Sequence, residues 1–290
     1  MPKDQTSIKS IVSRFKTDKP VRKTSYQVKG VLMKEFPDEP LIPFINGNYR
    51  NDFLYPRIQV KILNEQIYLV GIKEGVEPIE SIMKNLELLN FGNITFKVEN
   101  IESEKIELDI GCTDKAIHYN FLSPWIALNR VNLKRYKGFS EKKPKDQTDF
   151  LRRLLSQNIA FIGKEFGLSS ESRIFVDLSL ESAEPKMLDD GKAGSFAGSF
   201  NSNFVLPNYI GVGNGITKGF GVLLNNINKS SIIENSEKNV EPMQDLPEGW
   251  ENEAIDPNDI PRSKRNKPPK EKKSDNEPNF NTAEYHSKTH

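Results

Sequence analysis

The stretch Tyr55-Pro-Arg-Ile-Gln-Val-Lys-Ile-Leu-Asn-Glu-Gln-Ile-Tyr-Leu-Val-Gly-Ile72 carries the clearest folding signal of the chain. Two runs rich in β-branched and aromatic residues stand on either side of the polar pair Asn64-Glu65. This arrangement is typical of two strands joined by a tight turn. Upstream, residues 8–16 alternate like a strand, and residues 23–37 carry apolar side chains at helical spacing. The first 72 residues therefore predict a strand, a helix and a hairpin.

The residues after this hairpin continue the series. Residues 77–89 place aliphatic and methionine side chains on one helical face, and residues 94–110 alternate as a strand with a turn near Ser103. The order strand, helix, strand, strand, helix, strand is that of the split βαβ, or ferredoxin-like, unit. We therefore expect a first ferredoxin-like domain over residues 1–112.

The second half of the chain repeats this order in its pattern, although no individual residues repeat. Strands are expected at 115–122, 172–180, 194–206 and 220–224, and a long helix at 148–166 follows a short helical stretch at 126–136. The predicted fold class is α+β, with two tandem ferredoxin-like (βαββαβ) domains. The second domain is expected over residues 113–225.

From residue 226 onward Pro, Glu, Asn, Lys and Ser dominate, and we predict that the tail 226–290 is largely disordered. Its basic run 262–273 has two interpretations, a solvated linker or a nonspecific RNA tether. The segment Leu246-Pro-Glu-Gly-Trp250 holds an isolated aromatic residue, which is either a partner-docking motif or incidental.

The composition limits the classes of function. Lys and Arg number 41 and Asp and Glu 40, and the acidic excess lies in the tail, so the body is mildly basic. This balance permits nucleic-acid binding without requiring it. A single cysteine, Cys112, excludes an internal disulfide and a cysteine-rich metal site. The chain begins without a signal-like apolar stretch and has no run near the ~18 apolar residues of a membrane span, so we expect a cytoplasmic protein.

A glycine-rich segment, Gly211-Val-Gly-Asn-Gly-Ile-Thr-Lys-Gly-Phe-Gly221, precedes the last predicted strand. Such a loop exposes backbone N–H groups to an anion such as phosphate, and Lys218 adds a cation. The glycine spacing and the strand that follows exclude both the dinucleotide-binding fingerprint and the P-loop. Two interpretations remain, a turn system that serves packing alone or an RNA-contacting loop. The candidate RNA-contacting residues are Gly211, Gly213, Gly215, Lys218, Gly219 and Gly221.

This loop and its flanks, from Phe204-Val-Leu-Pro-Asn-Tyr-Ile-Gly to Lys-Gly-Phe-Gly, resemble the C-terminal signature of the RAMP superfamily. More narrowly, the chain resembles the CRISPR-associated repeat-processing endoribonucleases. Further stretches similar to this family follow in the same order at residues 55–61, 70–77, 120–129 and 195–200. The resemblance extends from about residue 10 to residue 224 and implies two ferredoxin-like domains, in agreement with the periodicity.

The resemblance implies cleavage of CRISPR repeat RNA without a metal or another cofactor. The ribose 2′-OH attacks the adjacent phosphorus, which leaves a 2′,3′-cyclic phosphate and a 5′-OH. The reaction needs a base, an acid, and cations or N–H groups that stabilise the phosphorane charge. The implied partners are precursor or mature CRISPR RNA and, as a second class, subunits of a CRISPR effector complex.

Many relatives place one or two histidines in the loop after the first helix. Here that loop, residues 38–52, has none, and the matching positions hold Pro43 and Phe44. An active endoribonuclease and a catalytically inactive repeat-RNA-binding subunit are therefore both open, and a nucleotide-binding protein is disfavoured by the order of loop and strand.

Four residues are candidates for the catalytic chemistry: Tyr49, Arg50, Tyr55 and His118. A tyrosine hydroxyl titrates near pH 10 in peptides, so it suits a proton donor better than a base. An arginine stabilises negative charge but does not act as a base. For each candidate the alternative is an ordinary surface or packed position.

Basic side chains outside the loop are candidates for phosphate contacts. Arg130, Lys134 and Arg135 follow Trp125 at near-helical spacing, and Arg152 and Arg153 lie near the start of the long helix. Phosphate contacts of this kind give an affinity that falls steeply with salt. The alternative is that these residues form solvated helix faces.

Overall fold

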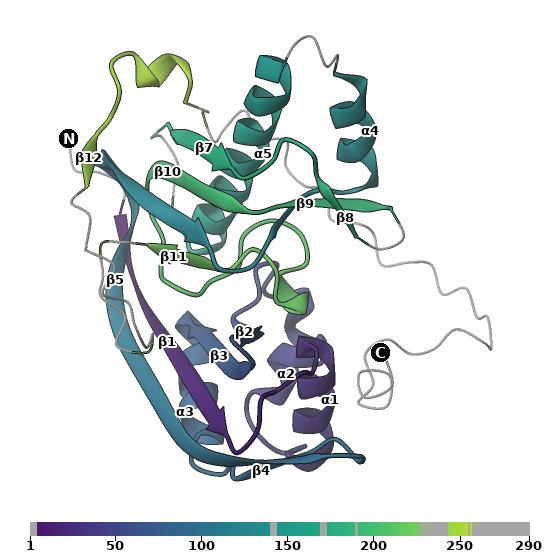
Figure 1. Cartoon of the computed structure of the whole chain (residues 1–290). Helices are drawn as coiled ribbons and strands as arrows, with labels where there is room; N and C mark the ends of the chain where they lie inside the picture. The colour runs from purple at the N-terminus through teal and green to yellow at the C-terminus, as the bar shows by residue number, and fades with distance from the viewer. Residues whose placement is uncertain are drawn as a thin grey trace.

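The computed structural model describes residues 5–139, 144–168, 173–188, 191–225, 227, 232, 243–254 and 256. Helices α1 to α3 cover the N-terminal strands, and α4 and α5 lie at the opposite end of the molecule (Figure 1). No helix within these ranges is both long and apolar enough to cross a membrane.

The N-terminal half has the predicted order of elements. They are β1 (Gln5–Thr17), α1 (Ser25–Glu35), β2 (Ile58–Leu63), β3 (Gln66–Ile72), η2 (Lys73–Gly75), α3 (Val76–Ile82) and the first part of β5 (Thr95–Phe121). Helix α1 begins at a capping box formed by Thr24 and Gln27. Asn64 and Glu65 both have positive φ angles, 48° and 58°, as the two central residues of a tight type I′ hairpin turn require.

Strand β5 differs from the prediction in its length. The predicted turn near Ser103 is wrong, because Ser103 pairs with Ser13 of β1 in an uninterrupted antiparallel register. The polar run that suggested a turn is part of the ladder, where Glu102 forms an ion pair with Arg14. The strand then continues through the predicted domain boundary at residue 112. Helix α3 ends earlier than predicted because β4 (Leu88–Asn90) pairs with the start of β5.

The C-terminal half consists of the second part of β5, α5 (Pro144–Glu165), β7 (Val176–Leu180), β10 (Gly198–Val205) and β11 (Leu223–Asn225). The glycine-rich loop, residues 211–221, takes the place of the second helix of the unit and holds only the single turn η3 (Ile216–Lys218). Four further elements form a separate flank: β6 (Trp125–Leu128), α4 (Arg130–Gly138), β8 (Lys186–Leu188) and β9 (Ala193–Phe196). Strands β6, β9 and β8 make a three-stranded sheet.

The strands of the two halves have the same spatial order. The N-terminal order is β5-β1-β3-β2 and the C-terminal order is β11-β5-β10-β7, all antiparallel. In each half the first strand of the unit lies between the fourth and the third. Strand β5 is the fourth strand of the first unit and the first strand of the second, and Figure 1 shows it running along the molecule. The predicted fold of two tandem ferredoxin-like domains is confirmed, with one strand in common.

The molecule has two apolar cores. The first lies within the N-terminal half and includes Val28 of α1 and Ile79 of α3. The second joins the two halves, because it contains Tyr68 of β3 together with Leu155 of α5 and the fully buried Trp125. The glycine-rich loop contributes Val212 to this second core, and this buried side chain anchors the loop.

Part of the predicted disordered tail has a defined place. Residues 243–254, here called the C-terminal strap, include β12 (Gln244–Asp245), which pairs with β5, and the turn η4 (Trp250–Asn252). The ring of Trp250 packs edge-on against Phe175 at a centroid distance of 6.4 Å. These residues differ from the predicted disorder because Trp250 and the pairing of β12 with β5 give them contacts that their polar composition does not indicate. The basic run 262–273 lies outside the described residues.

Candidate nucleic-acid interface

The glycine-rich loop has a fixed backbone shape. At its base Gly211 and Val222 form an antiparallel bridge, and its centre η3 is bounded by Gly215 and Gly219. These two glycines have φ angles of 73° and 93°, a conformation that is cheap for glycine and strained for other residues. A Cβ on Gly219 would also lie 2.8 Å from Oγ of Ser25 on α1. The backbone therefore requires glycine at both ends of η3.

The tip of the loop faces outward. Asn214, Thr217 and Lys218 are exposed, whereas Gly211 and Gly221 at the base are buried. Of the residues predicted to contact RNA, those that lie at least partly exposed are Gly213, Gly215, Lys218 and Gly219. An approaching polyanion thus meets the η3 end of the loop and not its base.

Side chains of the N-terminal domain hold the base of the loop. Gln59 accepts a hydrogen bond from the Gly211 N–H at 2.9 Å, and the Tyr55 hydroxyl donates to the Gly211 carbonyl at 2.7 Å. Tyr55 is completely buried, and this burial raises the pKa of its hydroxyl far above the usual range. The interpretation of Tyr55 as a proton donor for the reaction is therefore wrong, because its hydroxyl is engaged inside the fold and does not reach solvent.

Two lysines lie beneath η3, Lys29 of α1 and Lys61 of β2. Lys29 is 3% exposed and donates to the carbonyl of Thr217 at 2.6 Å. Lys61 is fully buried and donates to the carbonyl of Ile216 at 3.2 Å. Burial lowers the pKa of Lys29 to about 8. Burial, and to a lesser degree the positive charge of Lys29, lowers the pKa of Lys61 well below its usual value. We call these two residues the lysine pair.

The loop after α1 presents the first two catalytic candidates. It contains α2 (Ile42–Ile45) and η1 (Asn48–Arg50). Tyr49 is 39% exposed and Arg50 is also exposed. The Tyr49 ring packs edge-on against Phe44, with centroids 4.8 Å apart, and against Phe53 at 6.1 Å. The phenol of Tyr49 is therefore held by an aromatic cluster at a surface position.

The two positions that match the histidines of relatives hold residues that shape or pack the loop. Pro43 lies in the first turn of α2, where its missing N–H is not needed. Phe44 is half-buried and is the ring on which Tyr49 and Phe53 pack. The absent histidines are thus replaced by residues that shape the loop.

Helix α1 and strand β2 support both the loop after α1 and the glycine-rich loop. Helix α2 packs against α1 and β2, and η3 of the glycine-rich loop packs against the same two elements. Figure 1 shows η3 beside the group of α1 and α2. The exposed residues Tyr49, Arg50 and Lys218 therefore belong to loops that rest on one common support.

His118 lies elsewhere, on β5 in the C-terminal domain. It is half-buried, and its Nδ1 lies 2.9 Å from Oδ1 of Asn201 on the neighbouring strand β10. The structure therefore places this candidate in the ladder of the sheet and not in the loop after α1.

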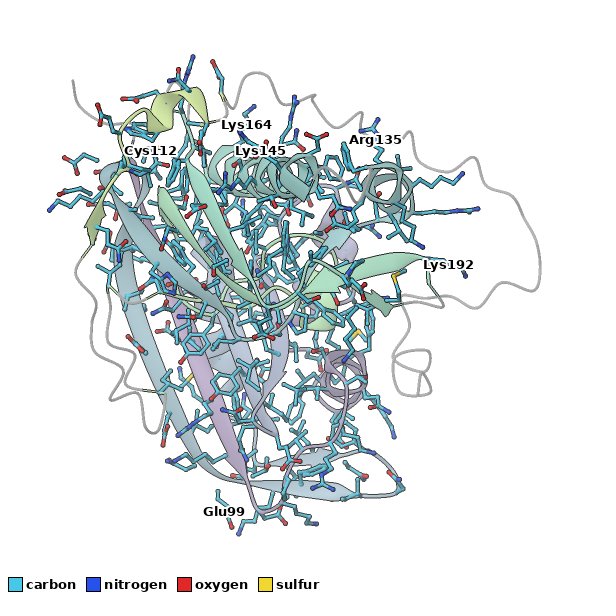
Figure 2. The ribbon with its side chains drawn as sticks, turned by 45° about the horizontal axis from the view of Figure 1, so that its top comes forward. Glu99, Cys112, Arg135, Lys145, Lys164 and Lys192 are labelled. Carbon is cyan, nitrogen blue, oxygen red and sulfur yellow. The ribbon has the colours of Figure 1, made fainter. Side chains whose placement is uncertain are left out.

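The predicted basic residues fall into two groups. Arg130, Lys134 and Arg135 are exposed on α4, and Arg153 is exposed on α5. Figure 2 shows Arg135 at the rim of the molecule near α4. Their exposure is compatible with phosphate contacts.

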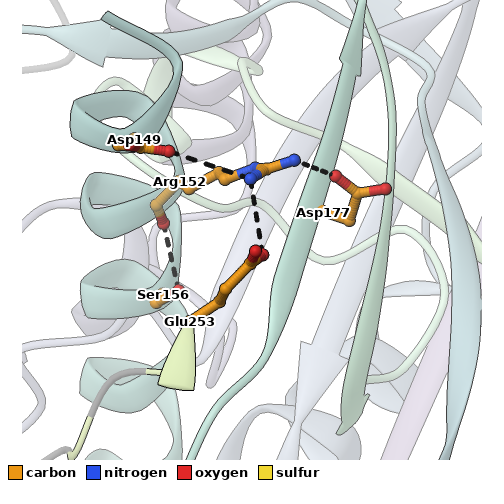
Figure 3. Close-up of polar contacts among 5 residues, drawn as sticks. All are labelled: Asp149, Arg152, Ser156, Asp177 and Glu253. Carbon is orange, nitrogen blue, oxygen red and sulfur yellow. Dashed lines mark hydrogen bonds and ion pairs between the residues drawn. The ribbon is translucent and has the colours of Figure 1, made fainter. Parts of the chain in front are cut away.

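Arg152 is different, because carboxylates surround its guanidinium. It forms a short ion pair with Asp177 of β7, and its Nη1 lies 3.5 Å from Glu253 of the C-terminal strap and 3.8 Å from Asp149 (Figure 3). A guanidinium shared by three carboxylates is compensated within the fold. This pairing leaves the Arg152 guanidinium less available to a phosphate than that of Arg153, and a contact of Arg152 with RNA stays a prediction.

The two ferredoxin-like units and the glycine-rich loop between β10 and β11 place the chain in the class of RAMP-type proteins. Comparisons with known proteins define the family. The Cas6b N-terminal domain model matches residues 6–108, and the Cas6b C-terminal domain model matches residues 111–226. The chain belongs to the Cas6b family.

Individual proteins are also similar to this chain. The structure is similar to a crystal structure of Cas6b, with 28% identity, a TM-score of 0.63, and coverage of 76% of this chain and 99% of that one. It is also similar to a crystal structure described as CRISPR RNA processing endoribonuclease Cas6b, with 25% identity, a TM-score of 0.56, and coverage of 76% and 100%. A protein of Methanocaldococcus jannaschii described as uncharacterized is 31% identical over 143 residues, which cover 49% of this chain and 95% of that protein.

The sequence patterns did not indicate that Lys29 and Lys61 belong to the site. Lys61 is the one charged residue in the strand Ile58–Leu63, and Lys29 lies beside the buried Val28 in α1. A charged residue within a strand whose neighbours are buried on both faces is the signal that could have indicated Lys61. Lys29 had no such signal, because its burial depends on the glycine-rich loop that covers it.

Proposed function

We propose that this chain is an endoribonuclease that binds CRISPR repeat RNA and cleaves it without a metal ion. In the proposed reaction the 2′-hydroxyl gives its proton to a solvent water molecule, and its oxygen forms a bond to the adjacent phosphorus. The bond from phosphorus to O5′ breaks, and O5′ takes up a proton. The products are a 2′,3′-cyclic phosphate and a 5′-hydroxyl.

The observation that carries the proposal is the placement of the exposed residues Tyr49, Arg50 and Lys218 on one support of α1 and β2, in a member of the Cas6b family. A solved protein similar to this one is described as a CRISPR RNA processing endoribonuclease. In our proposal, Tyr49 gives the proton to O5′ and Arg50 and Lys218 stabilise the phosphorane charge.

A second candidate function is a repeat-RNA-binding subunit of a CRISPR effector complex that does not cleave. The observation that favours it is the pair Pro43 and Phe44 at the positions matched to histidines, since an imidazole is the natural acid–base group near neutral pH. His118 does not supply this acid–base group in the loop, because it lies on β5 and its Nδ1 contacts Oδ1 of Asn201.

One experiment separates the two functions. The full chain is mixed with end-labelled cognate repeat RNA in excess EDTA, and with the same RNA carrying a 2′-deoxy sugar at the cleavage site. A shortened product with a cyclic phosphate end, from the ribose substrate alone, supports the enzyme. Tight binding without product over hours supports the subunit, and no binding at moderate salt contradicts both. The variant Tyr49→Phe, which removes one hydroxyl, reports on the proposed acid.

A further inference from the structure

The lysine pair has an unusual setting for two buried cations. Within the described residues, neither Lys29 nor Lys61 forms an ion pair with a carboxylate. Their nitrogen atoms reach carbonyl oxygens of η3, and the Nζ of Lys29 lies 5.3 Å from the centroid of the Tyr26 ring. Because burying unpaired ammonium groups is costly, their retention beneath the loop needs a reason.

The direction of these hydrogen bonds determines how η3 is presented. Lys61 draws the carbonyl of Ile216 inward and Lys29 draws that of Thr217 inward. Since a peptide group is planar and trans, a carbonyl that points inward turns the N–H of the next residue outward. For the carbonyl of Ile216 this is the N–H of Thr217, a residue with an exposed side chain. The inner face of η3 is therefore held by two lysine amino groups, and its outer face offers a donor beside Lys218.

We propose that Lys29 and Lys61 are positioning residues for RNA binding, which hold η3 in the orientation that meets an RNA phosphate, and that their protonation is coupled to that binding. The inference rests on the proposed RNA-binding function. The ligand is a backbone phosphate of the repeat RNA. The two lysines act through the Ile216–Lys218 turn and do not themselves touch the RNA.

The charges around the pair determine the sign of the coupling. The groups that face Lys29 are Lys61 of β2, the ring of Tyr26 on α1, and the carbonyl of Thr217. Lys218 is the charged residue of the turn itself. A phosphate on the outer face stabilises both ammonium forms, so binding raises their pKa values and takes up protons. Affinity is then greatest below the pKa of free Lys29, which is about 8, and falls as the pH rises through it.

The test measures the dissociation constant of the full chain for labelled repeat RNA with a 2′-deoxy sugar at the cleavage site, between pH 7 and pH 9. For one coupled proton with a free pKa of about 8, we expect the affinity to fall about tenfold over this interval. An ordinary surface lysine, with a pKa near ~10.4, contributes little change there. A wild-type profile that is flat overturns the proposal.

Four variants, each measured with its melting temperature, complete the test. Lys29→Met and Lys61→Met keep the stems and remove the nitrogen atoms, and we expect weaker RNA binding at pH 7, about tenfold or more, with an unchanged or higher melting temperature. Lys29→Arg keeps a donor that does not titrate, so it is expected to retain binding with a flatter profile. Lys218→Met, the surface control, is expected to bind more weakly and keep the wild-type slope.

The outcomes distinguish this inference from the proposed function. If the wild type binds the RNA at no pH, the proposed function fails. If the wild type binds and both methionine variants bind with the same affinity and slope, the positioning role fails and the proposed function stands.

Discussion

At the residue scale, the glycines of the loop differ in their steric constraints, and Gly213 has a matched control elsewhere in the chain. Its φ is 85°, and a Cβ there would lie 2.5 Å from Nε1 of Trp125. Gly92 has nearly the same φ, 84°, and open space around it. The two positions share a backbone conformation and differ in crowding.

This comparison gives the first prediction. Gly92→Ala costs about 1 kcal/mol of unfolding free energy, because only the positive φ is strained. Gly213→Ala costs several times as much, since the buried indole must also move. Urea unfolding of the two variants measures the difference. Equal losses would mean that Trp125 gives way freely.

The second prediction concerns two tyrosines that the sequence makes equivalent. Tyr55→Phe leaves the buried Gly211 carbonyl without the phenol donor, which lowers the unfolding free energy by about 1–3 kcal/mol. Tyr49→Phe at the surface changes stability by less than about 0.5 kcal/mol. If Tyr49 is the proposed acid, its loss slows cleavage by about 10²-fold or more. Thermal unfolding and single-turnover cleavage separate the two effects, and unimpaired cleavage by Tyr49→Phe excludes it as the acid.

Sequence patterns indicate residue types at the site but not burial. Tyr49 and Tyr55 are six positions apart in one segment, and the packing of Gly211 and Phe166 on Tyr55 distinguishes them. Lys29, Lys61 and Arg152 look like solvated charges in the sequence, and each is enclosed by elements distant along the chain. Long-range contacts of this kind have no periodic signal.

At the element scale, the helices and most strands follow from periodicity, whereas the C-terminal strap does not. The strap adds β12 to β5, places Trp250 on Phe175 and accepts a hydrogen bond from Arg173 at the carbonyl of Glu251. Two strand residues and one aromatic ring in a polar segment are too few for a pattern to detect. The strap is stabilised by the surface it covers.

The third prediction follows from this contact. A chain that ends after residue 242 loses the cover over the apolar ring of Phe175, so its melting temperature falls by a few degrees. A chain that ends after residue 256 keeps the strap and removes the basic run, and it retains the wild-type melting temperature. Glu253→Gln changes stability by less than about 1 kcal/mol, because the Glu253 side chain of this ion pair is largely exposed. Equal melting temperatures of the two shortened chains would contradict a stabilising strap.

At the scale of the whole molecule, the order of elements predicts both ferredoxin-like units but not that they share β5. The sequence shows two alternating runs, 94–110 and 115–122, and nothing in the alternation states that they are one strand. The continuous pairing with β1 and then with β10 joins them. The predicted boundary at residue 112 therefore lies within a strand and not in a linker.

The fourth prediction tests this arrangement. Since each unit needs β5 to complete its sheet, the described body is expected to unfold in one cooperative transition, with coincident curves from circular dichroism and tryptophan fluorescence. The separate fragments 1–112 and 113–225 divide the apolar core that contains Tyr68 of the first fragment and Leu155 of the second, so neither is expected to fold stably alone. Two resolved transitions would show that the domains are independent.

The shared strand also limits how the molecule can move. Two domains joined by a flexible linker close on a ligand by bending at a hinge of a few residues, but here bending would also have to open the apolar core to which Tyr68 of the N-terminal half and Leu155 of the C-terminal half both belong. We therefore expect the angle between the two units to be the same with and without bound RNA. A rigid platform of this kind selects RNA whose shape already fits the surface, and adaptation falls to the nucleic acid.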